Sequence, residues 1–248
     1  MKEKPNDDII YGRNSVMEAL KSGRPANKLL FAGDKAGSMG AIITLAKEHG
    51  IVFSETSKDK LDEITDKANH QGVVLYVASA DYCDVDDILA LAKEKNEPPF
   101  VIILDEIQDA SNLGAIIRTA DAVGAHGIII PKRRAVPLTS AVAKASSGAV
   151  SYVKVARVPN IPQTIDNLKD EGLWIAGTDL TGETEFYKAD LKGPLGVVIG
   201  SEGNGMGRLV REKCDMVLTI PMKGQVNSLN ASVAAGVVLY EAFKQRGK

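Results

Sequence analysis

Residues 100–131 read FVIILDEIQDASNLGAIIRTADAVGAHGIIIP, and this stretch decides the fold. Its first part, FVIILDEI, is a continuous apolar run, which is typical of a strand buried on both faces. NLGAIIRTADAVGA then places apolar residues at helical spacing, and GIIIP at 127–131 is a second apolar strand. A strand, a helix and a strand in this order predict a parallel βαβ unit.

The same alternation continues to the C-terminus. Strands are expected at YVKVARV, LWIAGTD, LGVVIG and MVLTIPM, with helical segments between them and a long last helix from about Asn227. The pattern predicts the α/β class, with a mostly parallel sheet in residues 100–248 and helices on both faces.

Residues 1–79 carry a second, smaller α/β pattern, in which helical stretches such as RNSVMEALKSG alternate with β-rich runs such as GVVLYVA. Between the two patterns lies ADYCDVDDILALAKEKNEPP, residues 80–99, which is acidic and ends in two prolines. We interpret it as a linker with a short helix opened by Asp86. As a flexible coil it spans about 20–25 Å and lets the modules move.

Composition narrows the function classes. The chain has 248 residues and a net charge of −2, and residues 81–97 alone carry 2 basic and 6 acidic side chains. An RNA-binding surface must therefore be a local patch. No apolar run is long enough to cross a membrane, and the polar start favours a cytoplasmic location. Cys83 and Cys214 are expected to be free thiols, and the three scattered histidines do not have metal-ligand spacing, so no metal is expected.

Common nucleotide-binding and hydrolase motifs do not fit. In GSEGNGMG, a dinucleotide fingerprint that starts at Gly203 and Gly205 meets Arg208 where its third glycine should stand. The sequence also lacks a phosphate loop of the form GxxxxGK[ST] and a GxSxG nucleophile elbow. A nucleotide-dependent oxidoreductase is therefore disfavoured.

Two polar, glycine-containing segments follow buried strands, where ligands of open α/β sheets bind. The segment ASNLGAIIRTADAVGA, residues 110–125, has Asn112 as a candidate helix cap and places Arg118 among apolar residues. A cation there is costly unless it is paired or functional, and a structural salt bridge is the alternative. In IGSEGNGM, residues 199–206, glycines flank Glu202, and a tight turn with an exposed carboxylate is the alternative.

A third segment, IPMKGQVNSLNASVAAG at 220–236, opens the last helix. Asn227 and Ser228 can cap this helix, whose first N–H groups can meet polar ligand atoms. A well-capped helix without a ligand is the alternative.

Together, NLGAIIRTADAVGA, VVIGSEGNGM and IPMKGQVNSLNASVAAGVVLYE resemble the three ordered motifs of the SpoU (TrmH) family of RNA ribose 2′-O-methyltransferases, in the SPOUT superfamily. The resemblance covers about residues 100–246. The N-terminal part, with IYGRNSVMEAL and HQGVVLYVA, is similar to the family's auxiliary RNA-binding domain, which resembles ribosomal proteins that grip bent RNA. The arrangement is most similar to members acting on large-subunit ribosomal RNA, although tRNA-modifying members share the motifs.

The resemblance implies a trefoil knot near the C-terminus, S-adenosylmethionine as the cofactor, a homodimer, and a guanosine of 23S ribosomal RNA as the target. The family's active-site positions carry over onto Asn112, Arg118, Glu202, Ser228 and Asn230. Cofactor contacts are implied at Gly177, Thr178, Gly200, Ile220, Met222 and Leu229.

For the chemistry, the family proposal makes the arginine the base, but arginine is effectively always protonated. We expect Arg118 to bind the neighbouring phosphate and the developing alkoxide, and leave two routes open for the proton, through that phosphate or through Glu202.

The loop PKRRAV, with Lys132, Arg133 and Arg134, is expected to hold RNA phosphates, with a solvated loop as the alternative. ASVAAGVVLY at 231–240 is apolar or small on almost every face, which predicts a homodimer unless the N-terminal module covers that helix. A tRNA target and a non-catalytic RNA-binding assembly factor remain alternatives.

Overall fold

The computed structural model describes residues 8–203, 205–225 and 228–247. The chain divides into two compact units. The first comprises the N-terminal residues up to Asp81 together with Pro137–Ser140, and the second comprises Tyr82–Val136 and the residues from Ala141 onward. Within the described ranges, no helix has the length and apolar character that a membrane span requires.

The first unit contains a four-stranded sheet in the order β1-β4-β2-β3. Together with its helices, this sheet agrees with the α/β pattern predicted for the N-terminal residues. Its strands are β1 (Ile9–Tyr11), β2 (Ala26–Phe31), β3 (Val52–Glu55) and β4 (Val73–Val77), and its helices are α1 (Arg13–Lys21), α2 (Ser38–Glu48) and α3 (Lys58–Ile64). Strand β4 runs antiparallel to β1 and β2, whereas β2 and β3 are parallel. Strand β1 was not predicted, because three residues are too few for a periodic signal.

The second unit is a seven-stranded sheet in the order β7-β6-β5-β10-β8-β11-β9. Every strand pairing described in it is parallel, which confirms the predicted parallel sheet. Its strands are β5 (Phe100–Leu104), β6 (Gly127–Pro131), β7 (Val155–Val158), β8 (Trp174–Thr178), β9 (Thr184–Glu185), β10 (Leu195–Ile199) and β11 (Met216–Thr219). Strand β9 was not predicted, since it has only two residues.

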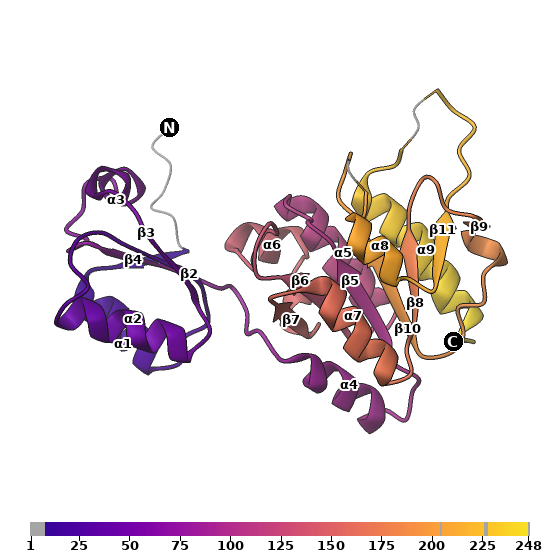
Figure 1. Ribbon diagram of the computed structural model, residues 1–248, viewed down its shortest axis with the longest axis horizontal. Helices are drawn as coiled ribbons and strands as arrows, with labels where there is room; N and C mark the ends of the chain where they lie inside the picture. Colours follow the sequence, from indigo (N-terminus) through magenta and orange to yellow (C-terminus); the bar gives the residue numbers. More distant parts are fainter. Residues whose placement is uncertain (1–7, 204, 226–227, 248) are drawn as a thin grey trace. The chain divides into compact units, whose positions relative to one another are not determined.

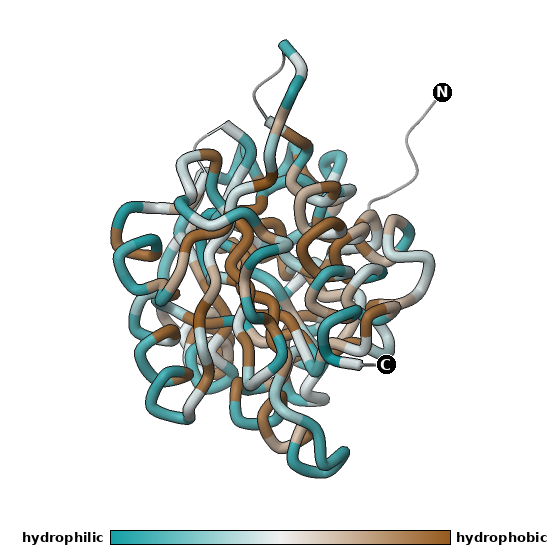
Figure 2. Tube along the Cα trace, turned by 90° about the vertical axis from the view of Figure 1, so that its right-hand side faces the viewer, coloured by the Kyte–Doolittle hydropathy of each residue, from teal (hydrophilic) through white to brown (hydrophobic). Residues whose placement is uncertain are grey.

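Helices cover both faces of this sheet (Figure 1). They are α4 (Val85–Glu94), α5 (Ala110–Ala122), α6 (Ser140–Ala145), α7 (Ile161–Asp170), α8 (Arg208–Lys213) and α9 (Ala231–Gln245), with short 3-10 turns η1 (Ala149–Ser151) and η2 (Phe186–Lys188). Helices α4, α7 and α8 share one apolar core with the sheet, and α5 packs against α9 on the opposite face. The apolar strands appear in brown between hydrophilic turns in Figure 2.

The segment expected to be a linker is largely part of the second unit. Residues 85–94 form α4, which begins after Asp84 and not after Asp86, because Asp84 and Asp87 form a reciprocal capping box. Its Ile88 is fully buried and lies so close to Gly127 that a Cβ there would meet Ile88 Cδ1 at 2.6 Å. A flexible coil is therefore wrong for these residues, since burial of the apolar face of α4 holds the helix on the sheet. The trefoil knot stays a prediction.

Candidate functional site

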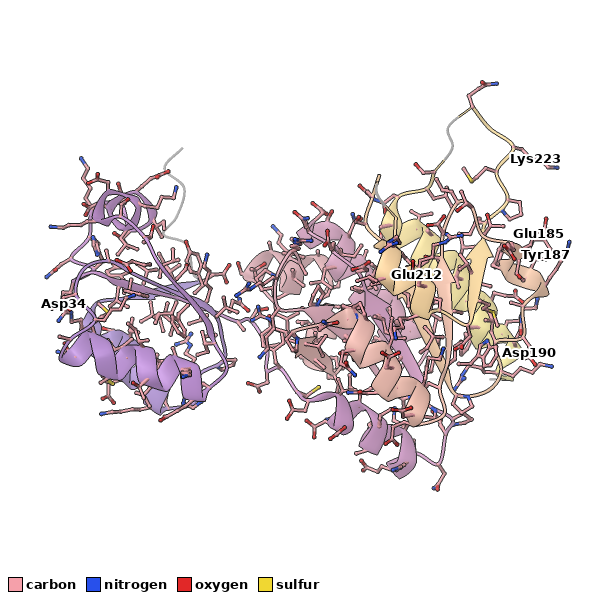
Figure 3. All side chains as sticks on the ribbon, viewed as in Figure 1. Asp34, Glu185, Tyr187, Asp190, Glu212 and Lys223 are labelled. Atoms are coloured by element: carbon pink, nitrogen blue, oxygen red, sulfur yellow. The ribbon has the colours of Figure 1, made fainter. Side chains whose placement is uncertain are left out.

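Three loops meet at the edge of the second sheet where β8, β10 and β11 end. They enclose a pocket together with the first turn of α9. The pocket is lined by Thr178, Asp179, Leu180, Ile199, Gly200, Ser201, Glu202, Gly203, Gly205, Leu218, Ile220, Met222, Ser228, Leu229, Ala231 and Ala234. The loop after β11 extends beyond the sheet edge and carries Lys223 (Figure 3). The position agrees with the rule that ligands of parallel sheets bind at the carboxyl ends of strands.

The loop after β10 needs its glycines. Ser201 and Gly205 exchange two backbone hydrogen bonds of 3.0 Å, which close the loop on itself. A Cβ on Gly200 would lie 2.3 Å from the carbonyl carbon of Gly205, so no other residue fits there without a shift. Gly205 also has a φ of 63°, a conformation that disfavours L side chains. The sequence therefore builds a tight loop that brings backbone atoms to the pocket wall.

Glu202, at the tip of that loop, is the centre of a hydrogen-bond network. Its Oε1 accepts from Asn112 Nδ2 at 3.2 Å, from the backbone N–H of Ala231 at 3.2 Å, and from Asn230 Nδ2. Asn230 Nδ2 also donates to Asn112 Oδ1 at 2.9 Å. Three segments that are distant in sequence thus meet at one carboxylate, which suits a group whose position matters chemically.

The helix caps differ from those expected. Asp109 caps α5 by accepting from the backbone N–H of Asn112 at 2.9 Å, so Asn112 lies in the first turn, where its side chain is buried. Asn230 caps α9 through its Oδ1, which accepts from the N–H groups of Ser232 and Val233. Asn227 lies outside the described residues, and Ser228 lines the pocket without capping the helix. Both caps follow the ordinary preference for Asp and Asn, but at positions a few residues away from those we expected.

A hydrogen bond and an ion pair fix the pocket wall at the end of β8. Thr178 Oγ1 donates to the Val198 carbonyl at 3.0 Å, and Asp179 pairs with Arg211 at 2.9 Å. Partial burial pushes the pKa of Asp179 up, but hydrogen bonds from Thr181 and the Arg211 guanidinium outweigh it and hold the pKa below its usual value. Asp179 is therefore an anion that anchors the loop after β8.

Five of the six residues expected to contact the cofactor line this pocket: Thr178, Gly200, Ile220, Met222 and Leu229. The sixth, Gly177, lies inside β8, where a Cβ would meet Met206 and Cys214 in the core. Gly177 is therefore next to a lining residue, Thr178, but is not itself part of the pocket lining.

Arg118 lies apart from the Glu202 network. It is exposed on α5, and its Nη1 donates to Ser147 Oγ at 3.4 Å. Six residues of helix turn a side chain by about 240° and advance it by about 9 Å, so Arg118 and Asn112 project from different faces of α5. The alternative for Arg118, a structural salt bridge, is not observed, because no ion pair of the described residues includes Arg118.

The basic loop after β6 is partly tethered. Arg134 has a φ of 58° and pairs with Glu106 at 3.0 Å, and the Lys132 carbonyl accepts from Arg157 Nη2 at 3.2 Å. These two contacts fix the backbone of the basic loop near the end of β5, and Arg133 is exposed to solvent there.

A second, polar pocket adjoins the first. It is lined by Glu106, Ile107, Gln108, Asp109, Asn112, Ser201 and Glu202. Ser201 and Glu202 line both pockets, so the carboxylate stands between an apolar-walled cavity and a polar one. Sequence reasoning did not identify Glu106 and Asp109 in this pocket, or Asp105 just before it, although three acidic residues within five positions after a buried strand were a usable signal.

Known proteins resemble this chain over most of its length. The family described as SpoU rRNA Methylase matches residues 99–240, and the domain described as RNA 2′-O ribose methyltransferase substrate binding matches residues 9–83. A TrmH family tRNA/rRNA methyltransferase by name, YacO of Bacillus subtilis, is 51% identical over 240 residues, which cover 96% of both chains.

Solved structures show the same likeness. The SpoU methyltransferase AviRb of Streptomyces viridochromogenes, in complex with S-adenosylmethionine, is 27% identical with a TM-score of 0.62, covering 96% of this chain and 90% of that one. An S-adenosylmethionine-bound rRNA methyltransferase of Sinorhizobium meliloti is 26% identical with a TM-score of 0.60, covering 95% and 86%.

Proposed function

Because the chain belongs to the SpoU family of RNA methyltransferases, we propose that it methylates a ribose 2′-hydroxyl in structured RNA, with S-adenosylmethionine as the methyl donor. The favoured target is a guanosine of 23S ribosomal RNA. The observation that carries the proposal is the junction of Asn112, Glu202 and Asn230 at the rim of the pocket, which unites the three motif segments in one site. The likeness to the Sinorhizobium meliloti rRNA methyltransferase over 95% of this chain favours ribosomal RNA over tRNA.

The chemistry of the pocket lining suits the cofactor. Its wall combines apolar side chains, including Leu218 and Leu229, with the backbone of Gly200 and Gly205. Apolar walls with a few polar groups suit an adenosine-containing ligand. When bound, S-adenosylmethionine supplies an electrophilic methyl group on a sulfonium.

The residues of this chain then have distinct tasks. Glu202 lies between the cofactor pocket and the polar pocket, so it can accept a hydrogen bond or a proton from a ribose hydroxyl placed there. Asn112 and Asn230 hold the Glu202 carboxylate in place. Arg118 supplies a fixed positive charge for RNA phosphate, because a guanidinium does not release its proton at neutral pH. Since Arg118 lies apart from Glu202 within one chain, its role in stabilising the developing alkoxide requires the second copy of the homodimer proposed below.

Labelled methyl transfer to ribosomal RNA and tRNA, followed by mapping of the modified nucleotide, tests the proposal. We expect Arg118→Ala to lower kcat at least about 10²-fold, as is common for groups that stabilise developing charge. Arg208→Ala is the matched control, since Arg208 is another exposed helix arginine, whose ion pair among the described residues is with Glu212 at 3.7 Å. Incorporation into tRNA alone contradicts the ribosomal target. Absence of incorporation into any RNA, with cofactor binding lost, contradicts the enzyme proposal.

The same proposal includes a homodimer formed through α9. Val233 and Tyr240 are 51% and 52% exposed on this helix, although the helix is apolar overall. Nothing lies within 4 Å of a Cβ placed on Gly236, so the Cβ of Gly236→Glu has open space in the described part of the chain. We expect this substitution to convert a dimer into a folded monomer in light scattering, with Gly193→Glu, at another open glycine, as the control. A wild-type monomer at micromolar concentration contradicts the dimer.

A further inference from the structure

Asp105 is a buried carboxylate for which the reaction outlined above has no use. It directly follows β5, its exposed fraction is 7%, and it is the only aspartate or glutamate among the buried residues of the described chain. Burial raises its pKa, and the hydrogen bond from Gly207 opposes that rise. Burying an acidic group is costly unless hydrogen bonds compensate, so we expect Asp105 to make specific contacts.

The contacts of Asp105 give that reason. Its backbone N–H donates to the Ile199 carbonyl at 2.9 Å, and its Oδ2 accepts from the Gly207 N–H at 2.7 Å. Ile199 is the last residue of β10, and Gly207 is the residue before α8. One residue therefore holds both stems of the loop 200–206, and that loop carries Glu202 at its tip.

We propose that Asp105 is a positioning residue that fixes the loop 200–206, and through it Glu202, between the cofactor pocket and the polar pocket. The proposal rests on the proposed function. Without the Asp105 acceptor, the Gly207 N–H loses its partner and the stem toward α8 is free to shift. Displacements of about 1 Å at a reacting group can cost 10²-fold in rate.

A matched control exists at the other end of α8. Asp215 Oδ2 accepts from the Ile175 N–H at 2.8 Å, and its Oδ1 pairs with Lys169 at 2.6 Å. Asp215 thus clamps backbone as Asp105 does, with a side chain that is 14% exposed, but at the amino end of β8, the sheet edge opposite the pocket.

The test compares Asp105→Ala, Asp105→Asn and Asp215→Ala in the full-length protein, with cofactor affinity from calorimetry and kcat and KM from methyl transfer to RNA. For Asp105→Ala we expect kcat to fall and the Kd of S-adenosylmethionine to rise, each at least about tenfold, with the KM for RNA within about threefold of wild type. Asp105→Asn keeps an acceptor oxygen and should return both quantities to within about threefold. Asp215→Ala should lower the thermal midpoint without either effect.

Several results overturn the proposal. Asp105→Asn as damaged as Asp105→Ala shows that charge, and not the clamp, is what matters. Asp215→Ala with the same losses shows a general effect of destabilisation. If Asp105→Ala does not fold, Asp105→Ser takes its place, since the serine side chain is one bond too short to keep the 2.7 Å contact with the Gly207 N–H, and normal cofactor affinity in that variant refutes the clamp. The calorimetric measurement stands even if the RNA assay shows no methylation, so failure of the clamp and failure of the proposed function are distinguishable.

Discussion

Asn230 performs two tasks with two ends of one amide, and substitutions can separate them. The Oδ1 atom caps α9 by accepting from the N–H groups of Ser232 at 2.9 Å and Val233 at 3.3 Å. The Nδ2 group donates to Asn112 and to Glu202. Serine retains the capping oxygen but loses the amide donors, whereas alanine loses both.

The expected magnitudes follow from these contacts. Loss of an N-cap costs about 1 kcal/mol of unfolding free energy, whereas exchange between good capping residues costs little. For a unit of this size, 1 kcal/mol corresponds to a fall in Tm of about 2–4 °C. We therefore expect Asn230→Ala to lower Tm by that amount and Asn230→Ser to leave it almost unchanged. Both variants should lose at least about tenfold in kcat, because Glu202 loses the same donor.

Thermal unfolding and steady-state methyl transfer, measured on the same preparations, check this prediction. The decisive comparison is between serine and alanine at position 230. If serine restores kcat as well as Tm, then the amide contacts with Glu202 are irrelevant to the reaction, and the reasoning about the network fails. If alanine leaves Tm unchanged, the cap is not a significant source of stability.

Three further predictions concern the cofactor, the RNA surface and the unit boundary. Gly200→Ala should weaken S-adenosylmethionine binding at least about tenfold in calorimetry, because its Cβ would lie 2.3 Å from Gly205, and unchanged affinity would contradict the loop geometry. Arg133→Ala should weaken RNA binding and reduce the salt dependence of log K by about one charge, and an unchanged slope in a titration series would show that the loop is only solvated. The fragment 82–248 should fold and bind cofactor but methylate RNA poorly, whereas 98–248 should unfold at lower temperature because it lacks α4, which circular dichroism can check.

The sequence was sufficient for the larger part of the architecture. Continuous apolar runs such as FVIIL and GIIIP predicted buried parallel strands, since only strands covered on both faces tolerate such composition. The linker interpretation was wrong for α4 because it gave more weight to the acidic residues and the two prolines than to the amphipathic pattern. In the structure, Ile88, Leu89 and Ala92 form one buried face of α4. Caps were displaced for a similar reason, because several Asn, Asp and Ser residues near a helix start satisfy the same preference.

The sequence by itself determined the residue types of the site: the glycines that a tight loop requires, the Glu202 between them, the asparagines near two helix starts, and the family to which these motifs belong. Only the tertiary structure decided which of them touch. Asn112 and Glu202 are 90 positions apart, and they meet because β10 inserts beside β5 in the sheet, a pairing that no local periodicity encodes. The same pairing places both stems of the Glu202 loop beside Asp105. Arg118 lies on another face of α5 from Asn112, because the direction of a side chain follows from helix geometry and not from its order in the motif.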